Sequence, residues 1–504
     1  MVFDINHIIG GFFNVLQPYN MLICIAGLFI GVLIGALPGL TATMGVAVCV
    51  PFSYVMEPEQ ALLLMSAVFC GGVYGGLIPA ILLGIPGTPA SAPTAFEGRA
   101  LTQAGESGRA LMAGTVGATF GGIMTALSLL LFSPPLAMVA MKVGPPEQMM
   151  LAIFGLSVVC MLSPDNIRKS LLVGFLCLLF ATVGQDPVMG YPRFTFNIYQ
   201  LTGGISVIPV LVGVFSIPEV LKMIENPSGK LVEASKVSKL ALHVKDITDN
   251  AFNLFRSGLI GVAIGIMPAA GPDIAAFLSY NEAKKASKEP EKFGKGSYEG
   301  IISAETAANG CTGGDLVPLL TLGIPGSAPA ALFLGAMIIH GLRPGPMLFT
   351  ENANVVYTMM VGFVIINILM FFVGWLYCRW SSNVLRIPKT ILAPVIVVLA
   401  AVGTFATNQN MFDVVTMFVA GIIGYGMEKH GYSVAPVALA LLLGPMLEEA
   451  LTLTNTMYAG HYLMMFTRPI TVILFAITVF SFVYPLFKIF REKMKSNKAA
   501  KAQS

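Results

Sequence analysis

The sequence predicts an all-α polytopic membrane protein with about 10–12 membrane segments, built from two inverted-topology repeats with broken helices or re-entrant hairpins. Three observations support this prediction. Hydrophobic residues make up 56% of the 504 residues and charged residues only 11%, whereas a soluble globular domain carries roughly 25% charged residues. Apolar runs such as 355–378 and 470–487 are long enough to cross a bilayer, which takes about 20 residues. The third observation is a set of helix-breaking glycines and prolines that occurs twice.

The duplicated set consists of two motifs that stand in the same order in each half of the chain. The sequence Gly-Ile-Pro-Gly stands at 84–87 and again at 323–326, an offset of 239 residues (323 − 84). Upstream, an offset of 230 residues (261 − 31) relates Gly31, Gly35 and Pro38 to Gly261, Gly265 and Pro268. Broken helices at corresponding positions of two halves are typical of secondary transporters, whose sites lie between the repeats.

The remaining segments are expected in order along the chain. Residues 1–18 contain no Lys or Arg and no cleavage signature, so we expect an interfacial first helix and no removable signal peptide. After the first pair of motifs, four apolar spans are expected near 110–132, 148–163, 169–184 and 205–222. After the second pair, five spans are expected near 352–378, 390–406, 411–428, 432–446 and 468–488.

Basic residues assign segments to the two sides of the membrane. Lys and Arg cluster in the central linker, just after residue 283 and in the C-terminal tail, and the positive-inside rule places these segments in the cytoplasm. The predicted organisation is a first membrane repeat 1–224, a cytoplasmic linker 225–256, a second membrane repeat 257–467, a C-terminal transmembrane helix 468–488 and a basic cytoplasmic tail 489–504. The basic residues that do not fit are Lys142, Arg193, Arg343 and Arg468.

The charges around the two broken segments favour an inverted repeat. The segment 257–280 is broken at 267–272 and has basic clusters on both sides, which indicates two half-helices on the cytoplasmic face. Its counterpart 21–56 is broken at Pro38-Gly39 and is followed by Glu57-Pro58-Glu59, with no basic residue nearby. An inverted repeat places that second loop outside. A parallel duplication is the alternative.

Both breaks are rich in groups that can bind an anion without a basic residue. In lipid, unpaired backbone groups are tolerated only inside protein or along a watery cavity, and the helix N-termini that they form can hold an anion. No Lys or Arg lies within either duplicated core. The alternative is close helix packing, for which small residues also suffice. The candidate substrate-binding residues are Gly39, Thr41, Thr43, Gly84, Pro86, Gly87, Thr88, Gly323, Pro325, Gly326 and Ser327.

Acidic and polar residues near the second break form a candidate cation site. An ionisable group at membrane depth is costly and is therefore a functional candidate. The candidate cation-binding residues are Asp273, Asn309, Thr312 and Asp315. The two aspartates could help to hold Na⁺ or carry a proton; the alternative is that each caps a half-helix. Glu305, close to a cytoplasmic segment, is expected to be a solvated or capping residue.

Missing signatures exclude several other chemistries. The seven cysteines and five histidines show no metal-ligand spacing, so we expect no cofactor and no metal beyond Na⁺. The chain has no GxxxxGK(S/T), HExxH or GxSxG motif, so we expect neither ATP hydrolysis nor another enzymatic activity. An intramembrane enzyme would have to use Asp273 and Asp315 as its catalytic pair. The net charge of +3 gives no indication of nucleic acid binding.

Several motifs together resemble those of one known family. They are Gly35-Ala36-Leu37-Pro38-Gly39, Tyr74-Gly75-Gly76, Gly84-Ile85-Pro86-Gly87-Thr88-Pro89, Gly271-Pro272-Asp273, and Gly313-Gly314 with Gly323-Ile324-Pro325-Gly326. In both copies and in their spacing, they closely resemble the large membrane subunit of bacterial tripartite tricarboxylate transporters. The resemblance covers nearly the whole chain.

This resemblance implies a permease subunit of a secondary transporter in the bacterial inner membrane, with its C-terminus in the cytoplasm. Its implied partners, besides the lipid bilayer, are a small four-helix membrane subunit and a periplasmic solute-binding protein that delivers a carboxylate. The implied substrate is citrate or a related di- or tricarboxylate, imported by symport with Na⁺ or protons. From the residues alone, a passive channel for small organic anions is the alternative function.

Overall fold

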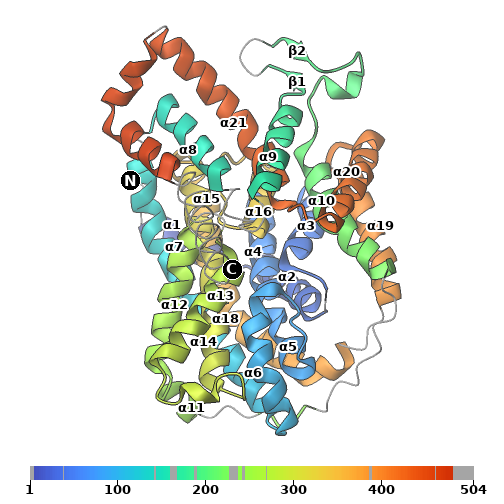
Figure 1. Ribbon diagram of the computed structural model, residues 1–504, viewed down its shortest axis with the longest axis vertical. Helices are drawn as coiled ribbons and strands as arrows, with labels where there is room; N and C mark the ends of the chain where they lie inside the picture. Colours follow the sequence, from blue (N-terminus) through green and yellow to red (C-terminus); the bar gives the residue numbers. More distant parts are fainter. Residues whose placement is uncertain are drawn as a thin grey trace, which may run out of the picture. The chain divides into compact units, whose positions relative to one another are not determined.

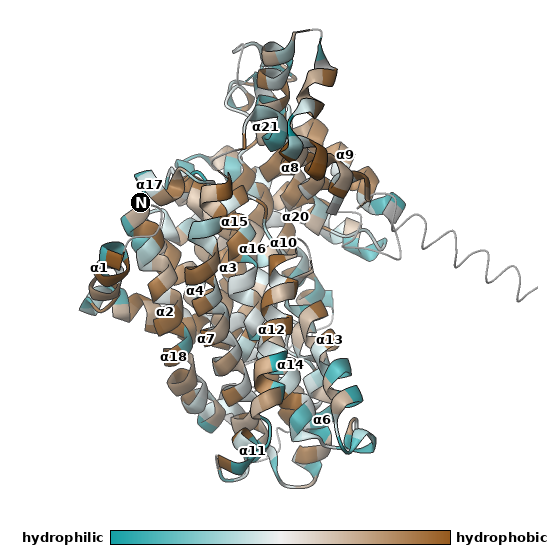
Figure 2. Ribbon diagram, turned by 90° about the vertical axis from the view of Figure 1, so that its left-hand side faces the viewer, coloured by the Kyte–Doolittle hydropathy of each residue, from teal (hydrophilic) through white to brown (hydrophobic). Residues whose placement is uncertain are grey.

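The computed structural model describes residues 5–37, 39–140, 143–158, 167–186, 190–225, 237–240, 244–267, 270–384, 389–459 and 461–480. Within these ranges the chain is almost entirely helical (Figure 1), and the strands β1 (Gly184–Gln185) and β2 (Pro192–Arg193) pair antiparallel. Eight of the described helices are long and apolar enough to cross a membrane, and Figure 2 shows the apolar residues along the helices. The prediction of an all-α polytopic membrane protein is confirmed.

Parts of several predictions lie outside the described residues. These parts are Pro38 and Pro268 of the two hairpin breaks, residues 226–236 and 241–243 of the linker, residues 481–488 of the last predicted helix, and the tail 489–504. The inverted orientation of the repeats and the domain boundaries at 224, 257 and 467 stay predictions.

The chain divides into two compact units, of which unit 1 comprises residues 1–140 and 208–426. Its helices come from both predicted repeats. They are α1 (Ile5–Val15), α2 (Pro18–Ala36), α3 (Ala42–Ser53), α4 (Pro58–Gly75), α5 (Leu77–Leu83), η1 (Pro89–Ser91), α6 (Ala92–Gln103), α7 (Ser107–Ala140), α10 (Val207–Glu225), α11 (Val244–Thr248), α12 (Ala251–Ile266), α13 (Gly271–Ala286), η4 (Pro290–Lys292), α14 (Tyr298–Gly314), α15 (Leu316–Leu322), α16 (Ala328–Ile339), α17 (Leu348–Glu351), α18 (Ala353–Val384), α19 (Lys389–Asn408) and α20 (Met411–Lys429).

Within unit 1, the duplicated motifs pack in the same way twice. Helix α2 packs against α4, and α12 packs against α14. A Cβ atom at Gly35 would lie 2.2 Å from the carbonyl oxygen of Gly72, and one at Gly265 would lie 2.5 Å from that of Cys311. These pairs are related by the offsets 230 (265 − 35) and 239 (311 − 72). Residues that are related by the two sequence offsets therefore make equivalent contacts in the two copies. Glycine is needed at these crossings because a side chain would hold the two backbones apart.

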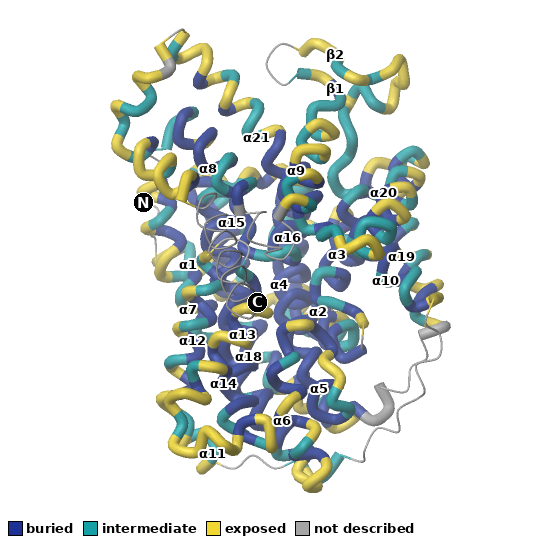
Figure 3. Tube along the Cα trace, viewed as in Figure 1, coloured by how far each residue is buried: buried dark blue, intermediate teal, exposed yellow. Residues whose placement is uncertain are grey.

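The two copies also contact one another inside unit 1. Helix α3 of the first copy packs against α16 of the second, and α13 of the second packs against η1 and α6 of the first. Helix α7 packs against α14 and α18, with the Cβ position of Gly121 only 2.0 Å from the carbonyl oxygen of Thr306. Figure 3 shows that α4 of the first copy and α15 of the second are largely buried. Helices of the two copies therefore pack against one another within unit 1.

Unit 2 comprises residues 141–207 and 427–504. Its elements are α8 (Pro145–Val158), α9 (Ile167–Ala181), β1, β2, η3 (Tyr199–Leu201), α21 (Ala435–Tyr458), η5 (Tyr462–Thr467) and the short helix Pro469–Phe480. Glu147 of α8 is fully buried; its Oε1 accepts a hydrogen bond from Thr471 (2.6 Å) and pairs with Arg468 Nε at 2.9 Å. Arg193 pairs with Asp186 and Glu448. Two of the basic residues that do not fit the predicted topology are therefore neutralised by carboxylates.

Candidate functional site

The two Gly-Ile-Pro-Gly segments end short helices with the same backbone geometry. Helix α5 ends at Gly84 with φ +70°, and α15 ends at Gly323 with φ +74°. The Gly84 N–H donates to the Ala80 carbonyl (3.1 Å) and the Gly323 N–H to the Leu319 carbonyl (2.9 Å). A positive φ favours glycine, because a side chain would be strained there. The predicted helix breaks are confirmed at both positions.

Within each copy, the two kinds of break touch one another. A Cβ atom at Gly87 would lie 2.3 Å from the carbonyl oxygen of Gly35, at the end of α2. In the second copy, a Cβ atom at Gly326 would lie 2.8 Å from the carbonyl oxygen of Gly265, at the end of α12. Motifs that are separated by 52 residues (87 − 35) in the first copy and 61 residues (326 − 265) in the second therefore lie in contact.

The substrate candidates of the first copy lie at both of its breaks. Gly39 is exposed with φ +94°, and Thr41 caps α3 by accepting a hydrogen bond from Met44 N at 3.2 Å. Thr43 is half-buried in the first turn of α3. In the second segment, Gly84 is half-buried, Pro86 is exposed, and Gly87 and Thr88 are buried.

The substrate candidates of the second copy are more enclosed. Gly323, Pro325 and Gly326 are buried, and Ser327 is half-buried. The Ser327 hydroxyl caps α16 by accepting a hydrogen bond from Ala330 N at 3.4 Å. The predicted helix N-terminus is therefore present after this break. The two copies differ in exposure although their sequences match, because the first segment leaves Pro86 accessible and the second encloses Pro325.

Two of the four cation candidates lie together. Asp315 is fully buried at the junction of α14 and α15, and its Oδ1 accepts a hydrogen bond from Cys311 Sγ at 3.3 Å. Its Oδ2 has no hydrogen-bond partner among the described residues. Asp273 is exposed in the first turn of α13, and the Cβ position of Gly271 at the start of this helix lies 3.7 Å from Ser327 Cβ at the second break. That these two aspartates contribute to one site stays a prediction.

The other two cation candidates make different contacts. The Thr312 hydroxyl donates to the Asn309 carbonyl (2.7 Å) and lies 3.9 Å from Cys70 Sγ of α4. Asn309 Nδ2 donates to the Glu305 carbonyl at 3.2 Å. These contacts lie within α14 and with α4, and neither residue makes a hydrogen bond to Asp273 or Asp315 in the described part of the chain.

The expectation that Glu305 is solvated or caps a helix is wrong. Glu305 lies inside α14 and is fully buried, and its Oε1 accepts a hydrogen bond from Thr94 of α6 at 2.6 Å. Glu305 is close in sequence to the basic cluster at 284–295, but it lies on α14, most of whose residues are buried in the packed interior. The almost unbroken run of small residues at 303–314 is the sequence signal for such an enclosed helix.

The buried charges of the described residues have one sign. The buried charged side chains are Glu97, Glu147, Glu305, Asp315 and Asp413, and no Lys or Arg of the described part is buried. Arg99, which follows the first break, is exposed and donates to the Leu82 carbonyl at the end of α5 (3.3 Å). Arg343, after the second break, is also exposed. An anion at either break would therefore meet backbone N–H groups and hydroxyls instead of a buried base.

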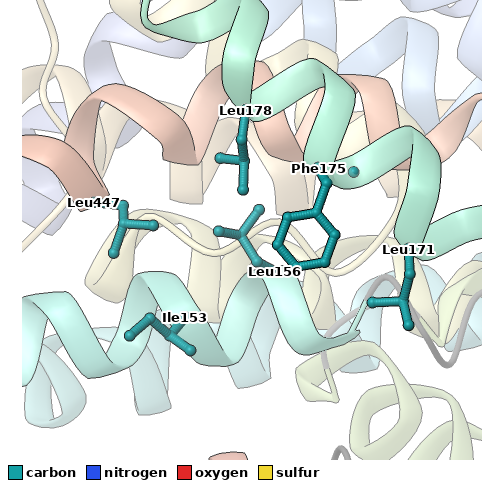
Figure 4. Close-up of a pocket in the computed structure, with 7 residues that line it drawn as sticks. Ile153, Leu156, Leu171, Phe175, Leu178 and Leu447 are labelled. Carbon is teal, nitrogen blue, oxygen red and sulfur yellow. The ribbon is translucent and has the colours of Figure 1, made fainter.

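A cavity of about 210 Å³ lies in unit 2, away from these residues in the sequence. Its side chains come from α8, α9 and α21, and Figure 4 shows six of them turned towards one another. They are Ile153, Leu156, Leu171, Phe175, Leu178 and Leu447, and Gly174 completes the lining. All these residues are apolar, and an apolar lining cannot compensate the desolvation of a carboxylate. This cavity is not the candidate substrate site.

Comparisons with known proteins bear on the whole chain. The model of one protein family, described as the tripartite tricarboxylate transporter TctA family, matches residues 21–439. The chain is 35% identical over 483 residues, 96% of each protein, to the "Uncharacterized 52.8 kDa protein in TAR-I ttuC' 3'region" of Agrobacterium vitis. It is 34% identical over 233 residues to the "Uncharacterized protein in TAR-II ttuC' 3'region" of the same organism, covering 46% of this chain and 96% of the relative. No solved structure matches the chain.

Proposed function

The chain belongs to the tripartite tricarboxylate transporter TctA family, and we propose that it imports di- or tricarboxylates of the citrate type by symport with Na⁺ or protons. The family supplies the large subunit of tripartite transporters. The eight long apolar helices of the described residues make this subunit a multi-pass membrane protein. We place it in the bacterial inner membrane with its C-terminus in the cytoplasm. Its proposed partners are a small four-helix membrane subunit and a periplasmic solute-binding protein.

One observation carries the proposal of cation symport: the buried charges around the breaks are acidic. Asp315 lies at the second break, and Glu305 bonds to Thr94 just after the first. A carboxylate substrate brings further negative charge into the same region. Uncompensated charge in a low-dielectric interior is costly, and no basic side chain of the described residues is buried there. A cotransported cation would supply the missing positive charge.

The proposed substrate contacts come from the two breaks. Each break is followed by the N-terminus of a helical segment, and the N-cap residues Thr88 and Ser327 add hydroxyls. Such groups bind carboxylates at helix N-termini in transporters with broken helices. Asp273 and Asp315 are the proposed cation ligands at the second break. Asn309 and Thr312 stay proposed ligands, although the hydrogen bonds that they make in this structure are with other residues.

The experiment that tests this function is uptake of labelled citrate into proteoliposomes that hold this chain, its small subunit and the binding protein. Uptake is measured with an inward Na⁺ gradient, with an inward proton gradient and with neither. We expect accumulation above the external concentration with one gradient only, which identifies the coupling ion. Uptake that only equilibrates and ignores both gradients would instead identify a passive channel for organic anions. If citrate is not taken up, a ligand screen of the binding protein selects the next carboxylate.

A further inference from the structure

Glu305 is a buried carboxylate for which the described residues provide no counter-charge. Its side chain has 0% exposure, and none of the ion pairs in the described part of the chain includes it. Thr94 donates to its Oε1 at 2.6 Å, and Oε2 has no hydrogen-bond partner among the described residues. Hydrogen bonds from neutral hydroxyls do not compensate the burial of a charged carboxylate. The described residues therefore leave this group without the positive charge that its ionised form requires.

The loop after the first break provides further oxygen atoms close to this carboxylate. The buried Ser91 hydroxyl interacts with the Glu305 carboxylate, and it makes no hydrogen bond to any other described residue. The Thr88 hydroxyl is also buried and without a described partner. Both hydroxyls point at Gly76, where a Cβ atom would lie 2.4 Å from Thr88 Oγ1 and 2.8 Å from Ser91 Oγ. Two buried hydroxyls thus occur in the segment that adjoins the Glu305 carboxylate.

The repeat explains why the carboxylate comes from the second copy. The offset of 239 residues (315 − 76) relates Gly76 to Asp315, so the first copy lacks the acid that the second copy has at the junction of its two helices. In the second copy, Asp315 Oδ1 lies 2.8 Å from the Cβ position of Gly326 in the break. In the first copy, Glu305 of α14 contacts α6, the helix after the break, by accepting the hydrogen bond from Thr94. Each break is thereby associated with one buried carboxylate.

We propose that Glu305, Ser91 and Thr94 form a binding site for one monovalent cation, either Na⁺ or a proton. This inference rests on the proposed function and assigns part of the coupling to a residue outside the predicted site. One carboxylate with neutral hydroxyls balances a single positive charge, and hard oxygen ligands suit both cations. The described residues contain no group of three or more His, Cys, Asp and Glu that could hold a metal ion, so a multivalent site has no basis here.

The other ionisable groups near this site do not supply the charge. Tyr74 of α4 interacts electrostatically with Glu305, and a neutral phenol cannot compensate it. Glu97 of α6 instead accepts hydrogen bonds from the Tyr280 hydroxyl and from backbone N–H groups at 294–297. The site therefore joins one helix of the second copy to the segment after the first break. Any movement of that segment relative to α14 would change the cation ligands.

The first experiment separates coupling from substrate movement in proteoliposomes that hold the complete transporter. Glu305→Gln is compared with the unmodified protein in gradient-driven accumulation and in carboxylate counterflow with equal cation concentrations on both sides. We expect accumulation to fall by about tenfold or more, since a charged contact is lost, while counterflow persists.

The control is Glu299→Gln. Glu299 is a half-buried acid on the same helix, and its carboxylate accepts a hydrogen bond from Ser287. Normal gradient dependence in Glu305→Gln would overturn the inference. Failure of the unmodified protein to accumulate substrate would instead contradict the proposed function.

The second experiment measures the cation directly on the purified complex. If Na⁺ binds, it raises the unfolding temperature relative to choline at fixed pH, because a ligand stabilises the state that binds it, and Glu305→Gln removes this response. If the proton binds, Na⁺ has no effect, and the variant loses the pH dependence of uptake.

If Glu305→Gln does not fold, the same measurements are made on Thr94→Val and Ser91→Ala. We expect each to shift the half-effective cation concentration by about tenfold without changing KM for the carboxylate. Unaltered Na⁺ and pH responses in both would overturn the site.

Discussion

At the scale of single residues, the buried acids differ in what surrounds them. Asp315 is fully buried beside the second break, whereas Asp273 is exposed at the start of α13. Glu97 has the opposite situation, because four donors converge on its carboxylate. Gly294, Gly296 and Ser297 donate backbone N–H groups at 2.5–2.8 Å, and the Tyr280 hydroxyl donates at 2.6 Å. The first two acids are therefore candidates for a ligand, whereas Glu97 is fully occupied by the protein.

The first prediction concerns Asp273. We expect Asp273→Asn to reduce cation-driven uptake by about tenfold or more, because the amide removes a negative charge that would hold the cation. Insertion into the membrane should be unchanged, since the residue is exposed and its side chain is replaced by one of equal size. The measurement is uptake per correctly inserted protein, with Asp249→Asn, an exposed change in the linker region, as control. Unchanged uptake and ion dependence would remove Asp273 from the site.

The second prediction concerns Glu97. In Glu97→Gln, an NH₂ group must replace one oxygen and would face two donors, which we expect to cost about 3 kcal/mol of stability. The segment 287–297 should detach from α6 and become more sensitive to proteolysis, while the unfolding temperature falls. Glu291→Gln is the matched control, since Glu291 is exposed in the short helix η4 of the same segment. Equal proteolysis of both variants would show that the contact does not hold this segment.

At the scale of helices, the packing depends on glycines at helix crossings. The third prediction is that Gly35→Ala and Gly265→Ala both lower the yield of folded protein. Each Cβ atom would lie within 2.5 Å of a carbonyl oxygen of the facing helix, and forced separation of packed helices costs about 1–3 kcal/mol or more. Gly10→Ala in α1 serves as control, because nothing lies within 4 Å of its Cβ position. The measurement is the monodisperse fraction after extraction in mild detergent; normal yields of both variants would contradict the packing role.

The helices themselves were largely predictable, and the contacts between them were not. Glycine and proline act on the backbone locally, so the breaks at Gly84 and Gly323 follow from sequence. Apolar runs likewise give the spans, because length and hydropathy decide them. In contrast, a helix that is enclosed on all sides has no polar face to give its orientation. The bond between Thr94 and Glu305, 211 residues apart, and the division into two units depend on packing and could not be read from such helices.

At the scale of the whole molecule, charge placement and the repeat bear on orientation. Arg193 and Arg468 do not fit the positive-inside assignment, but each pairs with a carboxylate in unit 2. These ion pairs explain how the folded protein accommodates the two arginines, but the positive-inside rule counts basic residues and not net charge, so both stay exceptions to the predicted topology. The repeated glycine contacts support a duplication. They are equally compatible with an inverted and a parallel arrangement, because a helix pair packs in the same way in either orientation.

The fourth prediction decides between these arrangements. Val55 and Lys285 are exposed residues near the ends of the two hairpins, related by the offset of 230 residues (285 − 55). Cysteines placed at these positions should be labelled by an impermeant maleimide from opposite sides of the membrane: Val55→Cys in intact spheroplasts, and Lys285→Cys only after permeabilisation. The unmodified protein gives the background, which should be low because five of its described cysteines are buried. Labelling of both from the same side would indicate a parallel duplication. That outcome would also remove the symmetric central site, since inverted halves place equivalent breaks at one membrane depth.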